Sequence, residues 1–294
     1  MAKNTKITKK QDSPKQETSE IKREENGNIV LNVSIKNSDI KKAWEEEVEN
    51  IVKNTTLTGF RTGTAPRSLV EKNIDKEKLK EDILKKLLPK AYLEAIEKNK
   101  LKPIVTPRIH IEKVEDPTSG KDWTFEATTC EAPDVNLGNY KEEIKKVTSK
   151  SKIIVPGKEN AEPSLDELLS TLIKAVKTNI PQIILDTETE RLLSQLLAEI
   201  KRLGLTLDQY LASSKKTIED LKKEYELKAQ ADLSIEFALA KIADTEKIEV
   251  DPKELDEALA KAQSEEEKKQ LANNMYLLAS IIRQQKTLDF IKKL

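Results

Sequence analysis

The chain has 294 residues, which is long enough for two domains that each bury a core of their own. Charged residues make up 35% of the chain and aromatic residues only 4%, so helices with solvated faces are favoured over a β-sandwich rich in buried rings. The formal net charge of +0 argues against a surface built throughout for nucleic acid, although a local basic patch is still compatible with it.

The cysteine content and the N-terminal sequence indicate in which cellular compartment the protein is expected. Cys130 is the only cysteine, so no disulfide can form within the chain and a reducing cytosol is the simplest setting. The first residues never develop an apolar run, so neither a signal peptide nor a transmembrane span is predicted. We expect a soluble cytoplasmic protein without a membrane partner.

Residues 1–26 are polar and charged, which predicts a disordered tail. The basic tip of this tail contains Lys3, Lys6, Lys9 and Lys10. A solvated terminus is the ordinary explanation of such a tip, and scanning of an anionic surface is the alternative.

The pattern of residues 27–147 predicts a small α+β domain. A strand begins near residue 28, because apolar side chains alternate through Ile29, Leu31, Val33 and Ile35. A helix, a glycine-containing loop, a short helix and a longer helix with Pro89 inside it should follow, and Pro89 is expected to kink or restart that helix. Residues 104–114 and 123–131 then form two strands, with Trp44 and Trp123 as core residues.

A linker is predicted at residues 148–163, and residues 164–294 predict only helices. Helix starts are marked by Thr206 with Gln209, Thr217 with Asp220, and Asp251 with Glu254. Residues 186–203 and one helix from near residue 264 should each bury an apolar stripe. The first stripe is Leu192, Leu193, Leu196, Leu197, Ile200 and Leu203, and the second is Leu271, Met275, Leu278, Ile282 and Leu288. The fold class is an α+β N-terminal domain followed by an all-α C-terminal domain with long helical arms, multidomain and extended.

Residues 57–67 interrupt the helical patterns and are typical of an exposed loop tip. Gly59 and Gly63 permit conformations that a side chain would forbid, and Pro66 can open the next helix. Phe60 beside Arg61 has the composition of a docking anchor, because Phe supplies apolar area and Arg pairs with carboxylate or phosphate. A turn whose aromatic folds back onto its own domain is the alternative.

No catalytic set, metal site or cofactor site is predicted. His110 is the only histidine and lies in the middle of a predicted strand, where a solvated or packed residue is expected rather than a general base. Cys130 has no histidine or second cysteine nearby in sequence, so neither a zinc site nor a thiol nucleophile is supported. The glycines do not form a phosphate-binding pattern.

The motif Gly59-Phe60-Arg61-x-Gly63-x-x-Pro66 resembles the signature of trigger factor, a bacterial ribosome-associated chaperone. Residues 87–92, 101–104 and 204–211 are similar to further segments of that family, in the right order. The resemblance implies that Gly59, Phe60, Arg61, Gly63, Pro66 and Arg67 form the ribosome-binding loop. It also implies docking on protein and rRNA of the large ribosomal subunit near the exit tunnel, with unfolded nascent polypeptides as clients. A weak homodimer is left open as a further partner.

The chain departs from the family in two places. Thr62 and Thr64 stand where members often carry lysines, so positive charge facing ribosomal RNA is lost and Arg67 can replace only part of it. Residues 147–180 leave room for a linker and one helix, but not for the family's prolyl isomerase domain. We therefore predict an ATP-independent holdase that is not an enzyme. The alternatives are a helical adaptor that uses the same loop for a protein partner and a periplasmic chaperone, which the absence of a signal peptide disfavours.

Overall fold

The computed structural model describes residues 21–56, 60–63, 65–151, 163–260 and 264–294. Most of the expected tail (1–20), Gly59 and most of the expected linker (152–162) lie outside the described residues. The described chain divides into an N-terminal unit that contains residues 29–129 and a C-terminal unit that contains residues 24–28 and 130–294. Each unit has its own apolar core.

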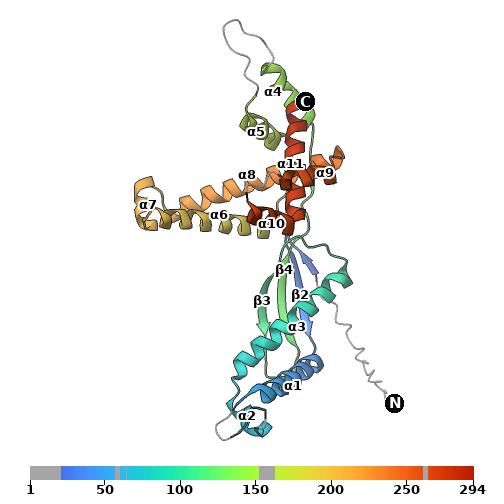
Figure 1. Cartoon of the computed structure of the whole chain (residues 1–294), viewed down its shortest axis with the longest axis vertical. Coiled ribbons are helices and arrows are strands. Elements are labelled where there is room, and N and C mark those ends of the chain that lie inside the picture. Colours follow the sequence, from blue (N-terminus) through green and yellow to red (C-terminus); the bar gives the residue numbers. More distant parts are fainter. Residues whose placement is uncertain (1–20, 57–59, 64, 152–162, 261–263) are drawn as a thin grey trace, which may run out of the picture. The chain divides into compact units, whose positions relative to one another are not determined.

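The N-terminal unit is built on a four-stranded antiparallel sheet in the order β1-β2-β4-β3. Its elements are β1 (Ile21–Arg23), β2 (Ile29–Ile35), α1 (Asn37–Asn54), α2 (Arg67–Asn73), α3 (Lys76–Asn99), β3 (Arg108–Lys113), the 3-10 turn η1 (Pro117–Ser119) and β4 (Trp123–Thr129). Helices α1 and α3 pack with one face of the sheet (Figure 1). The alternating residues of β2 face that core, as predicted.

One expectation for this unit is corrected, and one of the two alternatives for Pro89 is excluded. Residues 21–23, expected in the disordered tail, form strand β1, because their backbone groups pair with residues 29–31 across a tight turn. Helix α3 runs without interruption through Pro89, which therefore does not restart it. Trp123 is fully buried, whereas Trp44 is half-buried and packs against the edge of the core.

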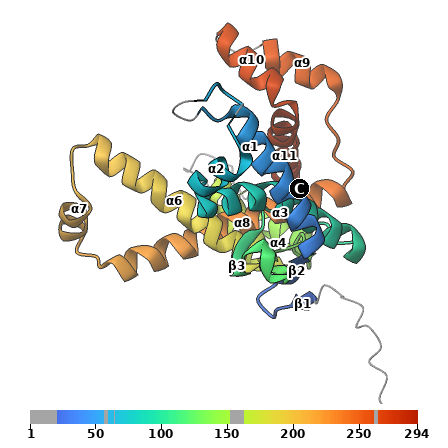
Figure 2. The ribbon, with the colours of Figure 1, turned by 90° about the horizontal axis from the view of Figure 1, so that it is seen from below.

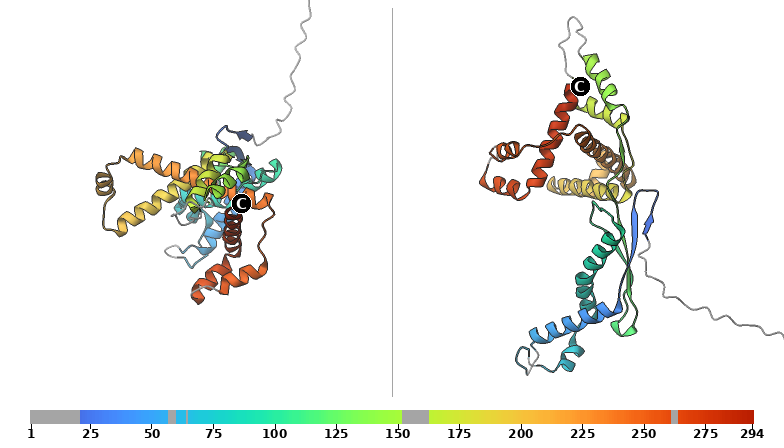
Figure 3. Two further views of the ribbon diagram at one scale, coloured as in Figure 1. Left: turned by 90° about the horizontal axis from the view of Figure 1, so that it is seen from above. Right: turned by 90° about the vertical axis from the view of Figure 1, so that its right-hand side faces the viewer.

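The C-terminal unit is mainly helical. Its elements are β5 (Val135–Asn136), α4 (Tyr140–Ser151), α5 (Leu165–Ala175), β6 (Lys177–Thr178), α6 (Gln182–Arg202), α7 (Leu207–Ser214), α8 (Ile218–Thr245), α9 (Pro252–Ala260), α10 (Glu265–Asn273) and α11 (Met275–Lys293). Helices α6 and α8 contact each other and diverge toward the far end, where α7 joins them (Figures 1 and 2). We call α6, α7 and α8 the first arm. Helices α9 and α10, the second arm, project from α11 in another direction (Figure 3).

The helix starts that were predicted from neighbouring residues are confirmed, whereas two other expectations for this unit are wrong. Both capping boxes, at Thr206 and Thr217, form as predicted, and the Asp251 N–H donates to Glu254 over 2.8 Å at the start of α9. The single helix expected from residue 264 is instead two, α10 and α11, which meet at Asn274. One short strand, β6, occurs where only helices were expected, because it pairs with β5.

Residues 130–147 were expected in the N-terminal domain, whereas the division of the structure places them in the C-terminal unit. Tyr140 and Ile144 of α4 are buried with Leu168 and Leu172 of α5 in the second core. The expected linker also begins inside α4, which ends at Ser151. The domain limits at 147 and 163 remain predictions, but the packing of α4 supports a division near residue 130.

Candidate functional site

The loop between α1 and α2 is closed at its base by two hydrogen bonds. The Gly63 N–H donates to the carbonyl oxygen of Thr55 over 3.3 Å. The hydroxyl groups of Thr56 and Thr62 share a hydrogen bond of 2.8 Å. These bonds join the two sides of the loop, so Phe60 and Arg61 lie between two pinned ends. Thr62, which stands where family members often carry lysine, uses its hydroxyl within the loop.

Gly63 occupies a position that requires glycine. Its φ of +77° lies in the left-handed region, and a Cβ at this residue would approach the carbonyl oxygen of Lys53 to 2.8 Å. Any side chain would therefore push the loop away from the end of α1. This is the physical reason for a glycine at this place in the motif.

The described loop residues present a mixed surface. Phe60 is 40% exposed, and Arg61 and Pro66 are exposed as well. Ala65 is buried and anchors the end of the loop before α2. More than a third of the surface of Phe60 is therefore available to another molecule, which suits an apolar contact beside a guanidinium group.

Arg67 is less available for binding an anionic partner than the sequence suggested. Its Nε donates to Glu71 Oε1 over 2.6 Å, one turn further along α2. The hydrogen bond to Glu71 and the charge of that carboxylate raise the pKa of Arg67. Because Glu71 balances this guanidinium, Arg67 is a weak substitute for the lysines that Thr62 and Thr64 replace.

A second candidate surface is formed by exposed apolar side chains of the first arm. These are Leu197 and Leu203 near the end of α6, Leu205 after it, and Ile218 and Leu227 in α8. Leu203 is 66% exposed, and both it and Leu197 were expected to face inward. That expectation is wrong for these two, because α6 packs mainly on α8 and buries only a narrow stripe that includes Leu192 and Ile200.

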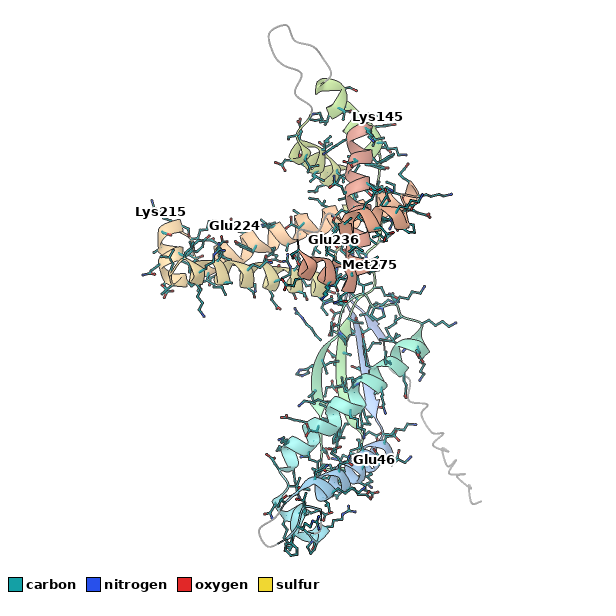
Figure 4. All side chains as sticks on the ribbon, viewed as in Figure 1. Glu46, Lys145, Lys215, Glu224, Glu236 and Met275 are labelled. Atoms are coloured by element: carbon teal, nitrogen blue, oxygen red, sulfur yellow. The ribbon has the colours of Figure 1, made fainter. Side chains whose placement is uncertain are left out.

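A third set of exposed apolar side chains lies in the first turns of α11, near the labelled Met275 in Figure 4. Tyr276 is 91% exposed, and Leu277 and Ile281 are also exposed. Leu277 and Ile281 are four residues apart and therefore share one helix face. Leu278 is buried as expected, whereas Met275, expected in the same buried seam, is exposed. We call Tyr276, Leu277 and Ile281 the α11 apolar set.

Charged side chains of α11 hold the segment that leads into the second arm. Lys286 Nζ donates to the carbonyl oxygen of Glu249 over 2.7 Å and to Glu254 Oε2 over 2.8 Å. Arg283 Nε donates to the carbonyl oxygen of Ile248 over 2.9 Å, and its guanidinium pairs with Asp244 over 2.6 Å. The hydrogen bond from Lys286 lowers the pKa of Glu254. These contacts fix the start of α9 relative to α11.

His110 and Cys130, the two candidates for catalytic chemistry, lie in different environments. His110 is exposed on β3, where the register places it opposite Glu126. Cys130 is fully buried, and burial raises the pKa of its thiol to about 11, so it is a poor nucleophile near neutral pH. In the part of the chain that the structure describes, His, Cys, Asp and Glu do not gather in a group able to hold a metal ion. Of the described helices, none has an apolar stretch long enough to span a bilayer.

Comparisons with known proteins agree with this architecture. The family model "Bacterial trigger factor protein (TF)" matches residues 17–168, and the model of the same family's C-terminus matches residues 140–293. Trigger factor of Staphylococcus epidermidis is 38% identical over 112 residues, which are 38% of this chain and 25% of that protein. Trigger factor of Staphylococcus aureus is 37% identical over 112 residues with the same coverage. The match therefore spans about a quarter of the length of these curated relatives.

A solved structure shares the fold. It is described as "Promiscuous Substrate Recognition in Folding and Assembly Activities of the Trigger Factor Chaperone" and matches with a TM-score of 0.62 at 14% identity, covering 93% of this chain and 99% of that one. The N-terminal family model alone matches more than half of the sequence, and the two models overlap at residues 140–168. This chain belongs to the trigger factor family.

Proposed function

We propose that this chain is an ATP-independent chaperone that docks on the large ribosomal subunit and shields unfolded nascent chains in the cytoplasm. The observation that carries the proposal is the exposure of apolar side chains on the first arm and α11, in a chain of the trigger factor family. Scattered apolar residues among charges bind unfolded segments weakly and without strict sequence demands.

Docking is assigned to the loop formed by Gly59, Phe60, Arg61, Gly63, Pro66 and Arg67. The closed base of the loop supports this assignment, because pinned ends lower the entropy lost when Phe60 and Arg61 bind. The expected partner surface combines ribosomal protein and RNA close to the exit tunnel. Binding energy from Phe60 would come from buried apolar area, and Arg61 would pair with a carboxylate or phosphate.

Client release is proposed to follow from competition. A client that folds buries its own apolar side chains, and the chaperone can then no longer bind them. Prolyl isomerase activity is not part of the proposal, since the two family models overlap at residues 140–168 and leave no unmatched segment between them. A protease-coupled assay on a proline-containing peptide tests this, and catalysis well above background would contradict it.

The ribosome proposal is tested by co-sedimentation with 70S ribosomes at low and moderate salt. We expect the wild type to pellet and Phe60→Ala/Arg61→Ala to stay in the supernatant. A matched control, Leu93→Ala/Lys85→Ala, removes an exposed apolar residue and an exposed cation from α3 and should pellet like the wild type. Because Thr62 and Thr64 carry no positive charge to neutralise a phosphate, the salt dependence should be shallow. Failure of the wild type to pellet at low salt would contradict docking.

The second candidate is a helical adaptor that uses the same loop for a protein partner. Suppression of aggregation separates the two, since a chaperone protects unrelated denatured proteins at near-stoichiometric amounts and an adaptor does not. We expect Leu277→Ser/Ile281→Ser to weaken protection severalfold, because it makes the α11 apolar set polar. Leu93→Ser, also an exposed leucine, is the control and should protect like the wild type. Lack of protection by the wild type would favour the adaptor.

A further inference from the structure

A pocket of about 340 Å³ lies in the N-terminal unit, where the second half of α1, the end of α2 and the start of α3 come together (Figure 1). Its floor is apolar, because Val70 and Leu79 are only 1% and 2% exposed and Ile51 and Ile74 are half-buried beside them. Its volume lies at the lower end of the range for pockets that bind ligands. The pocket therefore offers room for a few side-chain atoms of another molecule.

The charged side chains that line this pocket are mainly acidic. Three carboxylates, Glu47, Asp75 and Asp82, and one cation, Lys78, are found among the described residues of the lining. An apolar floor with an acidic rim suits a lysine or arginine side chain, because the aliphatic stem packs on the floor while the charged end meets the carboxylates. The lining therefore selects a cationic occupant.

Two of the three carboxylates already have a partner within the protein. Asp75 caps α3 and accepts the backbone N–H groups of Glu77 and Lys78 over 3.0 and 3.2 Å. Asp82 lies 3.8 Å from Lys85 Nζ, and the side chains of both residues are exposed, so this ion pair contributes little. Asp82 is thus still available to a cation from outside.

Glu47 is the carboxylate that the protein leaves without a partner. It is half-buried on α1, one turn before Ile51 of the pocket floor. Among the described residues, its side chain takes part in neither a hydrogen bond nor an ion pair within 4.0 Å, and Lys86 pairs with Glu46 instead over 2.8 Å. A half-buried carboxylate without a partner has lost part of its hydration, so a cationic ligand would stabilise it.

The pocket adjoins the base of the candidate docking loop. Thr55 lines the pocket, and its carbonyl oxygen accepts the N–H of Gly63 over 3.3 Å. Val70 of the floor belongs to α2, the helix that follows the loop. A molecule that covers Phe60 and Arg61 therefore lies next to the pocket as well.

We propose that this pocket binds a lysine or arginine side chain of the protein on which the loop docks. This inference rests on the proposed docking function and adds the charge of the partner surface to it. RNA is disfavoured as the occupant, because its phosphates would face the carboxylates of the lining. Thr62 and Thr64 favour the same choice, since neither carries a positive charge for a phosphate.

The first experiment titrates the full-length protein with a blocked octapeptide of lysine, leucine and alanine. A second octapeptide replaces each lysine by glutamine. Methyl NMR signals of Ile51 and Ile74 report on the pocket floor, and Ile242 in the core of the other unit is the internal control. We expect the lysine peptide to shift both pocket methyl signals and to bind about tenfold more tightly than the glutamine peptide. Equal affinity for the two peptides, or unmoved pocket signals, would overturn the inference.

Substitutions of opposite sign provide the second readout. Glu47→Gln should weaken binding of the lysine peptide about fivefold, and Lys78→Gln should strengthen it by about the same factor, because the two remove opposite charges from the lining. Glu97→Gln and Lys90→Gln, on α3 but outside the lining, are the matched controls and should leave the affinity unchanged. Equal effects in these controls would mean that net charge sets the affinity, which would overturn the inference.

The chain's own basic tip is the competing occupant, because it contains Lys3, Lys6, Lys9 and Lys10. If the tip filled the pocket, replacing these four lysines by glutamine would raise the affinity for the lysine peptide. We expect no change. A rise would assign the pocket to the tip and overturn its assignment to the docking partner.

Co-sedimentation with 70S ribosomes connects the pocket with docking. We expect Glu47→Gln/Asp82→Asn to weaken ribosome binding about fivefold, while the control Glu94→Gln/Glu97→Gln, two exposed carboxylates of α3, binds like the wild type. Unchanged binding of Glu47→Gln/Asp82→Asn would overturn the role of the pocket and leave the docking proposal standing. Failure of the wild type to pellet, with the lysine peptide still bound in the pocket, would refute docking and with it the assignment to a docking partner.

Discussion

At the scale of single residues, the candidate docking loop depends on one glycine. Gly63 and Gly120 have nearly the same backbone angle, with φ of +77° and +74°. They differ in their surroundings, because a Cβ at Gly63 would meet the Lys53 carbonyl oxygen at 2.8 Å, whereas a Cβ at Gly120 would meet nothing within 4 Å. An alanine at Gly120 therefore meets backbone strain alone, whereas an alanine at Gly63 meets the same strain and a steric conflict.

We predict that Gly120→Ala destabilises the N-terminal unit by about 1 kcal/mol, the usual cost of a left-handed conformation for alanine. Gly63→Ala should cost about 1–3 kcal/mol more, since the loop must also move away from α1. Urea unfolding followed by tryptophan fluorescence measures both, because Trp44 and Trp123 lie in this unit. Equal costs would show that the loop adjusts freely at Gly63.

At the scale of elements, the start of α6 is set by residues far away in sequence. Helix α6 begins at Gln182, although Pro181 at its N-cap offers no side-chain cap. The N–H of Gln182 donates to the carbonyl oxygen of Asn26, and the N–H of Ile183 donates to Asn28 Oδ1, each over 3.0 Å. The turn between β1 and β2 thus supplies the acceptors that the helix terminus lacks.

We predict that Asn28→Ala frays the first turn of α6 and lowers stability by about 1 kcal/mol, the typical cost of a lost helix cap. Hydrogen exchange of the Ile183 amide is the measurement, and it should become faster. Glu25→Ala, an exposed change in the same turn, is the control and should leave that rate unchanged. Unchanged exchange in Asn28→Ala would mean that another group caps the helix.

At the scale of the whole molecule, the chain has two separate cores. Leu168, Leu172 and Ile242 belong to the core of the C-terminal unit, whereas both tryptophans lie in the N-terminal unit. Tryptophan fluorescence therefore follows one unit, and far-ultraviolet circular dichroism follows the helices of both. Unfolding of such a chain need not be two-state.

We predict that Leu168→Ala destabilises the C-terminal unit by about 2–5 kcal/mol, as expected for a cavity in a core. The circular dichroism transition should move to lower urea, while the fluorescence midpoint stays in place. Val33→Ala, which truncates a buried side chain in the core of the N-terminal unit, should move the fluorescence midpoint instead. If Leu168→Ala shifted both signals equally, the two units would unfold as one.

Family membership and the candidate loop could be predicted from the sequence, because each motif that indicates them is a short run of residues. The caps at Thr206 and Thr217 and the alternation of β2 were equally local, since each involves neighbours within a few residues. Periodicity also found the apolar stripe of α6, but it could not tell buried Leu192 from exposed Leu203.

The remaining features required the tertiary structure, because each depends on a partner distant in sequence. Strand β1 is ordered by β2, β6 by β5, and the first turn of α6 by Asn26 and Asn28. A groove lined by Trp44 of α1 likewise needs residues of α2, α3 and η1 to complete its walls. The sequence by itself determined most of the helices, the capping boxes at Thr206 and Thr217, and the loop between α1 and α2, through local hydrogen bonding and periodicity. Only the tertiary structure decided which apolar side chains stay exposed, because that depends on which neighbouring elements come to cover them.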